Sequence, residues 1–426
     1  MQEAVALAGV VETEPAKTGS PMRDSILAGL ANYIDAGSIV AGSAALALWA
    51  ELYAMSPTMI GLIGAFSANA ISAGVGALIG GVLCDRFGRK RIYQYDMLFY
   101  AFGMGWLTFA VAPWMIVLGF VLVGLAVGAD IPASWSLIAE LAPQRERARY
   151  SGIAQMLWYL GPVVVLTLGL LLAPFGLLGI RLIFAHLLVL SLVLTLARSR
   201  MRESRYWEAA KAAEDHVARA DWRQLLQPKY LKSMLFLIGM YGFWNLWAGT
   251  NGFFFPYILR TVGGQSQQAS VALQALTFAL GMASIWFVFM KLSDRVNQRA
   301  LFLVSALMQV GGMTLLAVLP LTGPVAAVHV VVMAVAMGFG AQSFFQLWSA
   351  ELFPTLLRST AQGVTFAVVR IGLGVFSFFV PLLTATGFHM LAWILVGFLL
   401  VSAIIGWLGA PRNEGKSLEE IEAERA

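Results

Sequence analysis

The chain has few charged residues and only one cysteine among its 426 residues. Charged side chains make up 12% of the sequence, where a soluble domain has roughly 25%, and hydrophobic residues make up 59%. A water-soluble fold could not bury this much apolar surface, but a lipid bilayer can surround it. The single thiol, Cys84, excludes an intrachain disulfide and a metal site built from several thiolates.

The sequence also lacks the marks of a signal peptide and of an enzyme. Residues 1–22 have no basic stretch followed by an apolar core, so we expect a disordered cytoplasmic tail there. No nucleophile–base pair, metal-ligand spacing or phosphate-binding glycine motif is recognisable along the chain. We therefore expect no enzymatic activity, no metal and no cofactor.

Apolar stretches long enough to cross a bilayer recur along the chain. A helix needs about 20 such residues, and lipid accepts only helices or closed barrels. The stretches are too long and continuous for barrel strands, which predicts an all-α membrane protein with twelve transmembrane helices. The expected spans are 25–50, 57–83, 93–112, 115–140, 151–174, 179–198, 231–259, 267–290, 300–320, 324–350, 361–386 and 388–410.

The basic residues alternate between the loops of this topology. With twelve spans, one side collects nearly all Lys and Arg residues, and the other side carries only Arg181 and Arg260. Positive charge stays on the cytoplasmic side, so both termini are expected there, in an integral membrane protein of the cytoplasmic (inner or plasma) membrane. This distribution explains the net charge of +5 without any nucleic-acid partner.

The two halves of the chain repeat one motif. E-L-x-P-x-x-x-R-x-x-x-x-G begins at Glu140 and again at Glu351, each time after the fourth helix of its half. Asp85-Arg86 and Asp294-Arg295 likewise follow the second helix of each half. The repeat predicts two parallel six-helix bundles related by pseudo-symmetry. The expected divisions are an N-terminal bundle at 23–198, a cytoplasmic connecting loop at 199–230, a C-terminal bundle at 231–410 and a cytoplasmic tail at 411–426.

The segment 80–90, GGVLCDRFGRK, resembles the signature loop of the major facilitator superfamily, and the resemblance covers about residues 22–412. It implies the major facilitator fold. Acidic residues placed among the basic ones favour a latch between the bundles on the cytoplasmic side over a purely topological signal. The residues expected in this gating network are Asp85, Arg86, Arg89, Glu140, Arg147, Asp294, Arg295, Glu351 and Arg358.

Within that superfamily, the E-L-x-P motifs and the ending at 415–421 resemble the sugar-porter and organic-ion branches. Asp35 resembles the proton-accepting Asp in the first helix of sugar porters. Four residues of the sugar site that the resemblance implies are absent: Phe120 replaces an Arg, Asn245-Leu246 replaces a Gln pair, and Pro162 replaces a Gln. These departures argue against a hexose site of the usual kind.

Three charges within expected spans remain. Asp35 and Arg370 each lie about ten residues into a helix, and Asp130 lies ten residues before Glu140. At 1.5 Å per residue this places all three near the midplane. Charges at that depth usually face a polar cavity and mark function, although a purely structural Asp–Arg pair is an alternative. Arg370 resembles the substrate-binding Arg of the organic-anion branch, and a planar guanidinium suits a carboxylate. Asp35 or Asp130 is the expected proton carrier, because burial favours the neutral form of a carboxyl group.

Polar and aromatic side chains on other helices could complete a pocket for a small organic solute. Each of them taken singly is more often a packing residue. The expected substrate-binding residues beside Arg370 are Trp244, Asn245, Asn251, Gln342, Gln346, Gln155 and Tyr159.

Together these features predict a secondary active transporter that works by alternating access. The main prediction is proton-coupled symport of a small organic anion, such as a carboxylate or sugar-acid-like metabolite. The alternatives are a proton-coupled neutral monosaccharide or cyclitol porter, and a drug or metabolite exporter. A non-transporting receptor would usually add a large soluble domain, and the longest soluble segment expected in this sequence is roughly thirty residues, which argues against a receptor. The expected partners are the substrate, protons and lipid, and one chain contains both halves, so a monomer suffices.

Overall fold

The computed structural model describes residues 21–143, 146–199, 203–214, 222–413, 416 and 420–421. Within these ranges the chain forms helices and no strand. Most of the predicted N-terminal tail at 1–22, and more than half of the predicted C-terminal tail at 411–426, lie outside the described residues.

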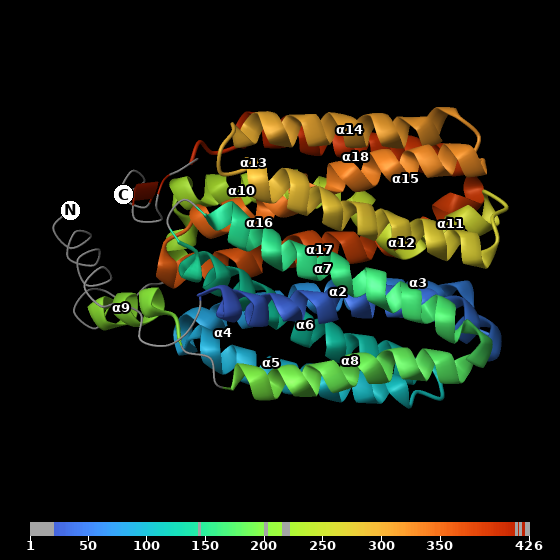
Figure 1. Cartoon of the computed structure of the whole chain (residues 1–426), viewed down its shortest axis with the longest axis horizontal. Helices are drawn as coiled ribbons and strands as arrows, with labels where there is room; N and C mark the ends of the chain where they lie inside the picture. Colours follow the sequence, from blue (N-terminus) through green and yellow to red (C-terminus); the bar gives the residue numbers. More distant parts are fainter. Residues whose placement is uncertain are drawn as a thin grey trace.

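The helices form twelve consecutive rods that run along the long axis of the molecule (Figure 1). The first six rods are α2 (Pro21–Leu52), α3 with α4 (Pro57–Ala65, Ile71–Phe87), α5 (Arg89–Thr108), α6 (Pro113–Leu141), α7 (Arg147–Leu172) and α8 (Leu177–Arg198). A 3-10 turn, η1 (Ala173–Phe175), follows α7. Among the described residues, eight helical stretches are apolar and long enough to cross a membrane by length and composition.

The second six rods contain more breaks. They are α10 with η3 and α11 (Pro228–Gly249, Thr250–Phe254, Phe255–Thr261), α12 with η4 and α13 (Gln267–Ser284, Ile285–Phe289, Met290–Leu292), α14 (Gln298–Val318), α15 with α16 (Gly323–Gly338, Ala341–Glu351), α17 (Thr355–Thr386) and α18 (Phe388–Gly409). The segments η3 and η4 are π-helical turns. Between the two sets lie α9 (Arg205–Glu214) and η2 (Trp222–Leu226).

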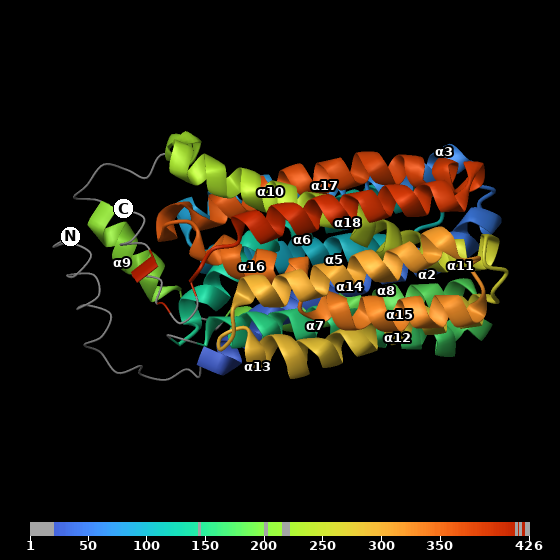
Figure 2. The ribbon, with the colours of Figure 1, turned by 90° about the horizontal axis from the view of Figure 1, so that it is seen from above.

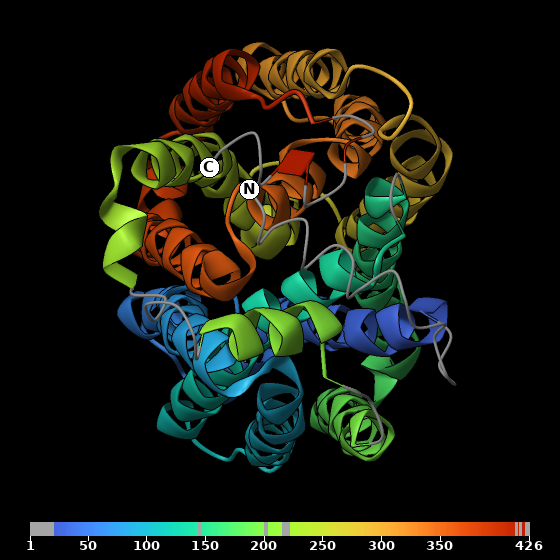
Figure 3. The same ribbon diagram turned by 90° about the vertical axis from the view of Figure 1, so that its left-hand side faces the viewer.

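The rods group into two bundles of six, as predicted from the repeated motif. The end-on view separates the blue-to-green bundle of the first half from the bundle of the second half (Figure 3). In both side views α9 lies beyond one end of the rods, and α3 and α11 lie at the other (Figures 1 and 2). We call the end where α2 begins and α18 finishes the latch end, and the opposite one the far end.

The outer surface of the rods is apolar, as a lipid-facing surface must be. On α8, Val189, Val193 and Leu196 follow one another at helical spacing and are 53–73% exposed. The polar side chains described below lie inside the bundles or between them. Lipid therefore replaces water as the outer solvent, and the exposed apolar rows are not packing defects.

The bundles meet closely along α4 and α17. A Cβ on Gly81 would overlap the carbonyl of Ser359 near the latch end, and one on Gly374 would press against Ala65 and Ile71 near the far end. Small residues let helices approach this closely within a membrane. The α4–α17 contact therefore fixes the walls of the space that the bundles enclose.

Candidate functional site

A pocket lies between the two bundles, about midway along the rods. Its empty volume is about 670 Å³, counted together with the open space at its mouth. The lining comes from both halves of the chain. It consists of Ala36, Ile39, Val40, Asn69, Trp158, Tyr159 and Pro162 from the first half, and Trp244, Asn245, Ala248, Gly249, Asn251, Gly252, Gln274, Thr277, Phe278, Met337, Gln342 and Arg370 from the second.

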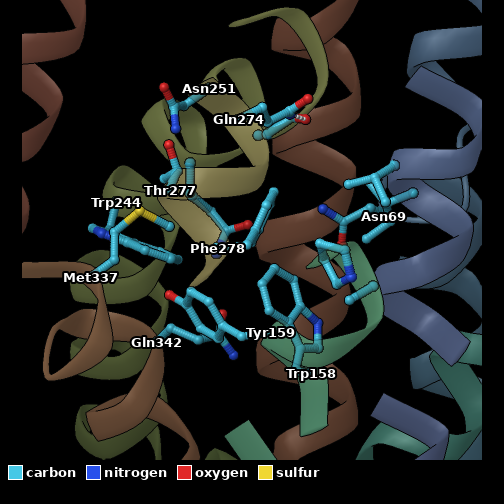
Figure 4. Close-up of a pocket in the computed structure, with 18 of the residues that line it drawn as sticks. Asn69, Trp158, Tyr159, Trp244, Asn251, Gln274, Thr277, Phe278, Met337 and Gln342 are labelled. Atoms are coloured by element: carbon cyan, nitrogen blue, oxygen red, sulfur yellow. Dashed lines mark hydrogen bonds between the residues drawn. The ribbon is translucent and has the colours of Figure 1, made fainter. Parts of the chain in front are cut away.

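Aromatic rings form one wall of this pocket. Trp158 and Tyr159 are neighbours on α7, and each lies within 6.0 Å, centroid to centroid, of Phe278 on α12 (Figure 4). Figure 4 also shows Asn251 and Gln274 on one side of these rings and Gln342 on the other. An apolar wall with a few placed amides suits a small polar organic molecule.

Arg370 on α17 is held by neutral groups. Its guanidinium donates to Asn245 Oδ1 at 3.0 Å, to the Tyr241 hydroxyl at 3.3 Å and to the Asn69 carbonyl oxygen at 3.3 Å. It also stacks on the Phe366 ring, 4.4 Å from the centroid. No carboxylate lies within the 4.0 Å ion-pair distance of this guanidinium among the described residues. Arg370 therefore orients the amide of Asn245 and keeps its positive charge at the pocket.

Several buried atoms at the pocket have no hydrogen-bond partner in the described part of the chain. They are donors at Asn245 Nδ2 and Arg370 Nε, and an acceptor at Gln274 Oε1. The hydrogen-bond partners of the two amide groups distinguish their oxygen atoms from their nitrogen atoms. Asn245 Oδ1 accepts from Arg370, and Gln274 Nε2 donates to the Gly252 carbonyl oxygen. Unpaired buried polar groups are costly. A ligand that both donates and accepts would satisfy all three.

Asp35 lies beside the pocket on α2. Its Oδ2 atom accepts from the Trp158 indole at 3.3 Å, its Oδ1 atom has no partner, and the side chain is buried. Trp158 lines the pocket, so a single side chain separates Asp35 from a bound molecule.

Asp130 does not line the pocket. It forms an ion pair with Arg198 of α8 at 2.7 Å, within the N-terminal bundle. The sequence placed Asp130 at one depth with Asp35 and Arg370, but it gave no sign that Arg198 bends back from the end of α8 to meet it.

Gln155 and Gln346 lie one helical turn nearer the latch end than the lining residues Tyr159 and Gln342. Their amides are hydrogen-bonded to each other across the bundle interface, and neither is part of the pocket lining. The other expected binding residues line the pocket: Arg370, Trp244, Asn245, Asn251, Gln342 and Tyr159.

The predicted gating residues gather at the latch end. Glu140 Oε1 accepts from Arg89 at 2.9 Å within its own bundle and from Arg358 at 2.8 Å across the interface. Asp85 accepts from the Thr360 amide of α17 at 2.6 Å and pairs with Arg89 at 3.2 Å. The two arginine side chains are 0% and 1% exposed, so these charges are paired away from water. We call this cluster of Asp85, Arg89, Glu140 and Arg358 the latch.

The second copy of the motif makes a matching contact. Asp294 accepts from the backbone amides of Ala148 and Arg149, both at 3.2 Å, at the start of α7 in the opposite bundle. A carboxylate suits a helix N-terminus, where amides are free and the dipole is positive. Each bundle thus presents one Asp to a helix of its partner.

The other predicted gating residues lie around this cluster. Arg86 and Arg295 are exposed, and Glu351 accepts from Asn413 at 3.0 Å. The side chain of Arg147 lies outside the described residues.

The comparisons with known proteins agree with this architecture. The model of the Major Facilitator Superfamily matches residues 26–375. The chain belongs to the major facilitator superfamily. It is a secondary transporter of that superfamily and not an enzyme.

Relatives of this major facilitator include proteins named as transporters. It is 47% identical to the minor myo-inositol transporter IolF of Bacillus subtilis, over 94% of this chain and 93% of that protein. It is 24% identical to the inner membrane metabolite transport protein YgcS of Escherichia coli, over 85% of each chain. The solved proton:xylose symporter XylE superposes with a TM-score of 0.79 at 17% identity, over 94% of this chain and 98% of that one.

The sequence analysis missed several residues of this major facilitator. Asn69, Gln274, Thr277 and Phe278 line the pocket, and Tyr241 supports Arg370. Gln274 had a usable signal, since an amide within an apolar span usually faces other protein groups. Asn69 had none, because it lies in the break between α3 and α4, and the sequence there reads as one continuous span.

Proposed function

We propose that this major facilitator transports a cyclitol, a ring polyol of the myo-inositol class, by alternating access. The 47% identity to a transporter named for myo-inositol, across nearly the full length of both chains, supports this alternative. It favours the cyclitol over the organic anion that was the main prediction from the sequence.

One observation in the pocket carries the proposal. The unpartnered Asn245 Nδ2 and Arg370 Nε are donors, and the unpartnered Gln274 Oε1 is an acceptor. Every hydroxyl of a cyclitol both donates and accepts, so one molecule can satisfy all three. A carboxylate only accepts and would leave Gln274 without a donor. The aromatic wall suits the apolar C–H faces of such a ring.

An organic anion is the second candidate, because one observation favours it. Arg370 has no carboxylate partner among the described residues, so its charge is available to an anionic ligand. A sugar acid would present a carboxylate to Arg370 and hydroxyls to Gln274. Arg370→Ala cannot separate the candidates, because it would also release the Asn245 and Tyr241 side chains.

We further propose that transport is driven by protons and that Asp35 accepts one. Its buried Oδ1 atom has no partner, and Trp158 joins it to the pocket wall. The concentration of basic residues on the loops of the latch end supports a cytoplasmic position for that end. Because the pocket is lined by both halves of one chain, a monomer suffices.

The test is uptake into liposomes that contain the purified protein. Labelled myo-inositol, a neutral hexose and a sugar acid are compared, each with and without an inward proton gradient. We expect saturable, gradient-dependent myo-inositol uptake that excess unlabelled sugar acid inhibits weakly. Sugar-acid uptake with the lower KM would overturn the cyclitol and support the anion.

Two variants connect this uptake to the pocket. Asn245→Ala and Gln274→Ala should each raise the KM for myo-inositol about tenfold, because each removes one hydrogen bond inside a buried site. Gln227→Ala is the matched control, since Gln227 is exposed before α10 and far from the pocket. A KM that is unchanged in both pocket variants would place the substrate elsewhere.

A further inference from the structure

A layer of contacts between the bundles lies between the pocket and the latch, and it has two halves. In one half, Trp135 on α6 packs edge-on against Phe366 on α17, with the ring centroids 5.9 Å apart. In the other half, Gln155 Nε2 on α7 donates to Gln346 Oε1 on α16. All four side chains are buried, and each contact joins one bundle to the other. We call Gln155 and Gln346 the amide pair.

The two contacts occupy equivalent places in the repeated motif. Trp135 and Gln346 each lie five residues before the Glu that begins the motif copy of their own half. Gln155 and Phe366 each lie fifteen residues after that Glu. Each contact therefore joins the earlier position of one half to the later position of the other, as the pseudo-symmetry of the bundles requires. Only the chemistry differs, because one contact is made by rings and the other by amides.

The depth of this layer follows from positions along the helices. Tyr159 and Gln342 line the pocket, and each lies one helical turn from a member of the amide pair, on α7 and α16. In the other direction, Glu140 of the latch lies five residues beyond Trp135 on α6. A molecule that moves along the interface from the pocket toward the latch end therefore meets this layer first.

The amide pair is only partly satisfied. Two facing amides can exchange two hydrogen bonds, but this pair makes one. Gln155 Oε1 and Gln346 Nε2 are buried without a partner in the described part of the chain. Exchanging oxygen and nitrogen in both amides would give the same inventory, which is one unpaired acceptor and one unpaired donor. The Trp135 indole nitrogen is a further buried donor without a partner among the described residues.

The next contacts toward the latch are fully paired, so unpaired groups are not a general property of this interface. The Ser136 hydroxyl donates to Gln362 Oε1 at 2.9 Å and lies 2.9 Å from the Ser359 hydroxyl. Gln362 Nε2 in turn donates to the Ser349 hydroxyl at 3.1 Å. Unpaired buried polar groups are costly. The layer of the amide pair therefore has a capacity for a polar ligand that its neighbour lacks.

We propose that the amide pair is a second, transient binding site for the transported polyol, occupied between the pocket and the latch end. As the bundles part, two adjacent hydroxyl groups of the solute replace the hydrogen bond between Gln155 and Gln346. Because each hydroxyl both donates and accepts, the solute pairs with the unpaired acceptor and the unpaired donor as well. The rings of Trp135 and Phe366 offer an apolar surface to its C–H face. This proposal rests on the proposed cyclitol transport and adds a site outside the pocket.

Exchange of labelled for unlabelled myo-inositol across liposomes that contain the purified protein tests this site. The double variant Gln155→Met with Gln346→Met replaces both amides by unbranched apolar side chains. We expect its exchange rate to fall about tenfold or more, because the hydroxyl groups then cross the layer without partners. The Kd for myo-inositol, measured by calorimetry, should stay close to that of the wild type, because every residue that lines the pocket is retained.

Three results would contradict this expectation. Faster exchange in the double variant would mean that the amide pair only holds the bundles together. Unchanged exchange would mean that the solute does not bind there. A Kd that weakens as much as the exchange rate would assign the amides to the pocket itself. Each of these results would overturn the transient site.

Thermal unfolding in detergent checks the amide contact independently of transport. Each single variant leaves the other amide buried without any partner, whereas the double variant removes both polar groups. We therefore expect the double variant to be more stable than either single variant. A double variant that is less stable than both, or that does not fold, would overturn the proposal.

Asn32→Leu is the matched control, because it also replaces a buried amide by an apolar side chain. Asn32 on α2 donates to the carbonyl oxygen of Ala154, next to Gln155, but both residues of this contact belong to the N-terminal bundle. We expect its exchange rate to equal that of the wild type. A loss as large as that of the double variant would show that any buried amide near α7 has the same effect, and would overturn the proposal.

The transient site and the proposed function fail in different ways. A wild type that exchanges the hexose or the sugar acid but no myo-inositol would contradict the cyclitol. The ratio of variant to wild-type exchange, measured with that solute, would still decide the role of the amide pair, because both solutes carry adjacent hydroxyl groups. A wild type that exchanges none of the three would overturn both proposals.

Discussion

The two ends of the interface between the bundles are held by different kinds of contact. At the latch end, Glu140 binds Arg89 and Arg358, and Asp85 and Asp294 each accept amides from the opposite bundle. At the far end the contacts seen are neutral. Ser43 donates to the Phe253 carbonyl oxygen at 3.0 Å, and the backbone at Gly374 packs against α3 and Ile71.

This difference has a consequence for alternating access. Buried ion pairs are costly to break one partner at a time, because each break leaves a charge without compensation. Contacts between small residues separate with much less dependence on charge. The latch end is therefore the one whose opening can be controlled by a proton or by a mutation of one charge.

Cys84 offers a reporter of this comparison. It is the single cysteine of the chain, it is buried, and it lies on α4 next to Asp85 of the latch. A maleimide that crosses the membrane should modify Cys84 only when the latch end opens, so its labelling rate follows the population of that state.

The largest expected effect comes from breaking the latch. Glu140→Gln leaves Arg89 and Arg358 buried with half of their negative partners gone. We expect the free energy of unfolding to fall by about 3–5 kcal/mol and Cys84 labelling to accelerate. Thermal unfolding in detergent measures the first effect. Glu146→Gln is the control, because its pair with Arg149 is exposed and should contribute less than about 1 kcal/mol. Equal losses in the two variants would contradict the latch.

The next largest effect is expected from matched glycine-to-alanine substitutions, one at each end of the interface. Gly81→Ala would force the backbone of α17 away near the latch end, and Gly374→Ala would do so near the far end. Overpacking costs roughly 1–3 kcal/mol in the closed state of the affected end, which changes its population by about five- to a hundredfold. We expect faster Cys84 labelling in Gly81→Ala and slower labelling in Gly374→Ala. A change in the same direction for both would show that the two ends do not alternate.

A smaller effect should follow from Asp294→Asn. The amide oxygen can still accept from the start of α7, but the charge that favours a helix N-terminus is removed, which amounts to about 0.3–1 kcal/mol. We expect Cys84 labelling to rise only a few-fold. Asp85→Asn should raise it more, because Asp85 also pairs with the buried Arg89. If Asp294→Asn accelerated Cys84 labelling more than Asp85→Asn, the two motif copies would not differ as the structure indicates.

The smallest effect is expected at the far end. Ser43→Ala removes one hydrogen bond to a carbonyl oxygen, which contributes about 1 kcal/mol or less. Opening of the far end should become slightly easier, and Cys84 labelling should become slightly slower. A loss as large as that of Glu140→Gln would show that the far end is held as firmly as the latch end.

Part of this site could be predicted because it follows from local sequence. The E-L-x-P repeat and the segment 80–90 predicted which residues would meet at the latch end, and Asp85, Arg89, Glu140 and Arg358 do so. A residue's depth along a helix also follows from counting, which is how Arg370 was expected near the midplane, and the structure places its side chain at the pocket between the bundles.

The partners of the buried charges could not be predicted in the same way. The sequence suggested a substrate carboxylate for Arg370, whereas the structure surrounds its guanidinium with Asn245, Tyr241 and a backbone carbonyl. It also gave no reason to join Asp130 and Arg198. Which faces of neighbouring helices turn toward one another depends on their rotation and packing, and periodicity within one helix does not contain that information.

The sequence by itself determined that this chain crosses a membrane twelve times, that its halves repeat and that charge concentrates at one end. Composition, span length and motif repetition are properties of the chain alone. Only the tertiary structure decided that Asn245, Gln274 and Arg370 share a pocket while Asp130 lies outside it and pairs with Arg198. Those contacts join residues up to about three hundred positions apart, and packing between helices brings them together.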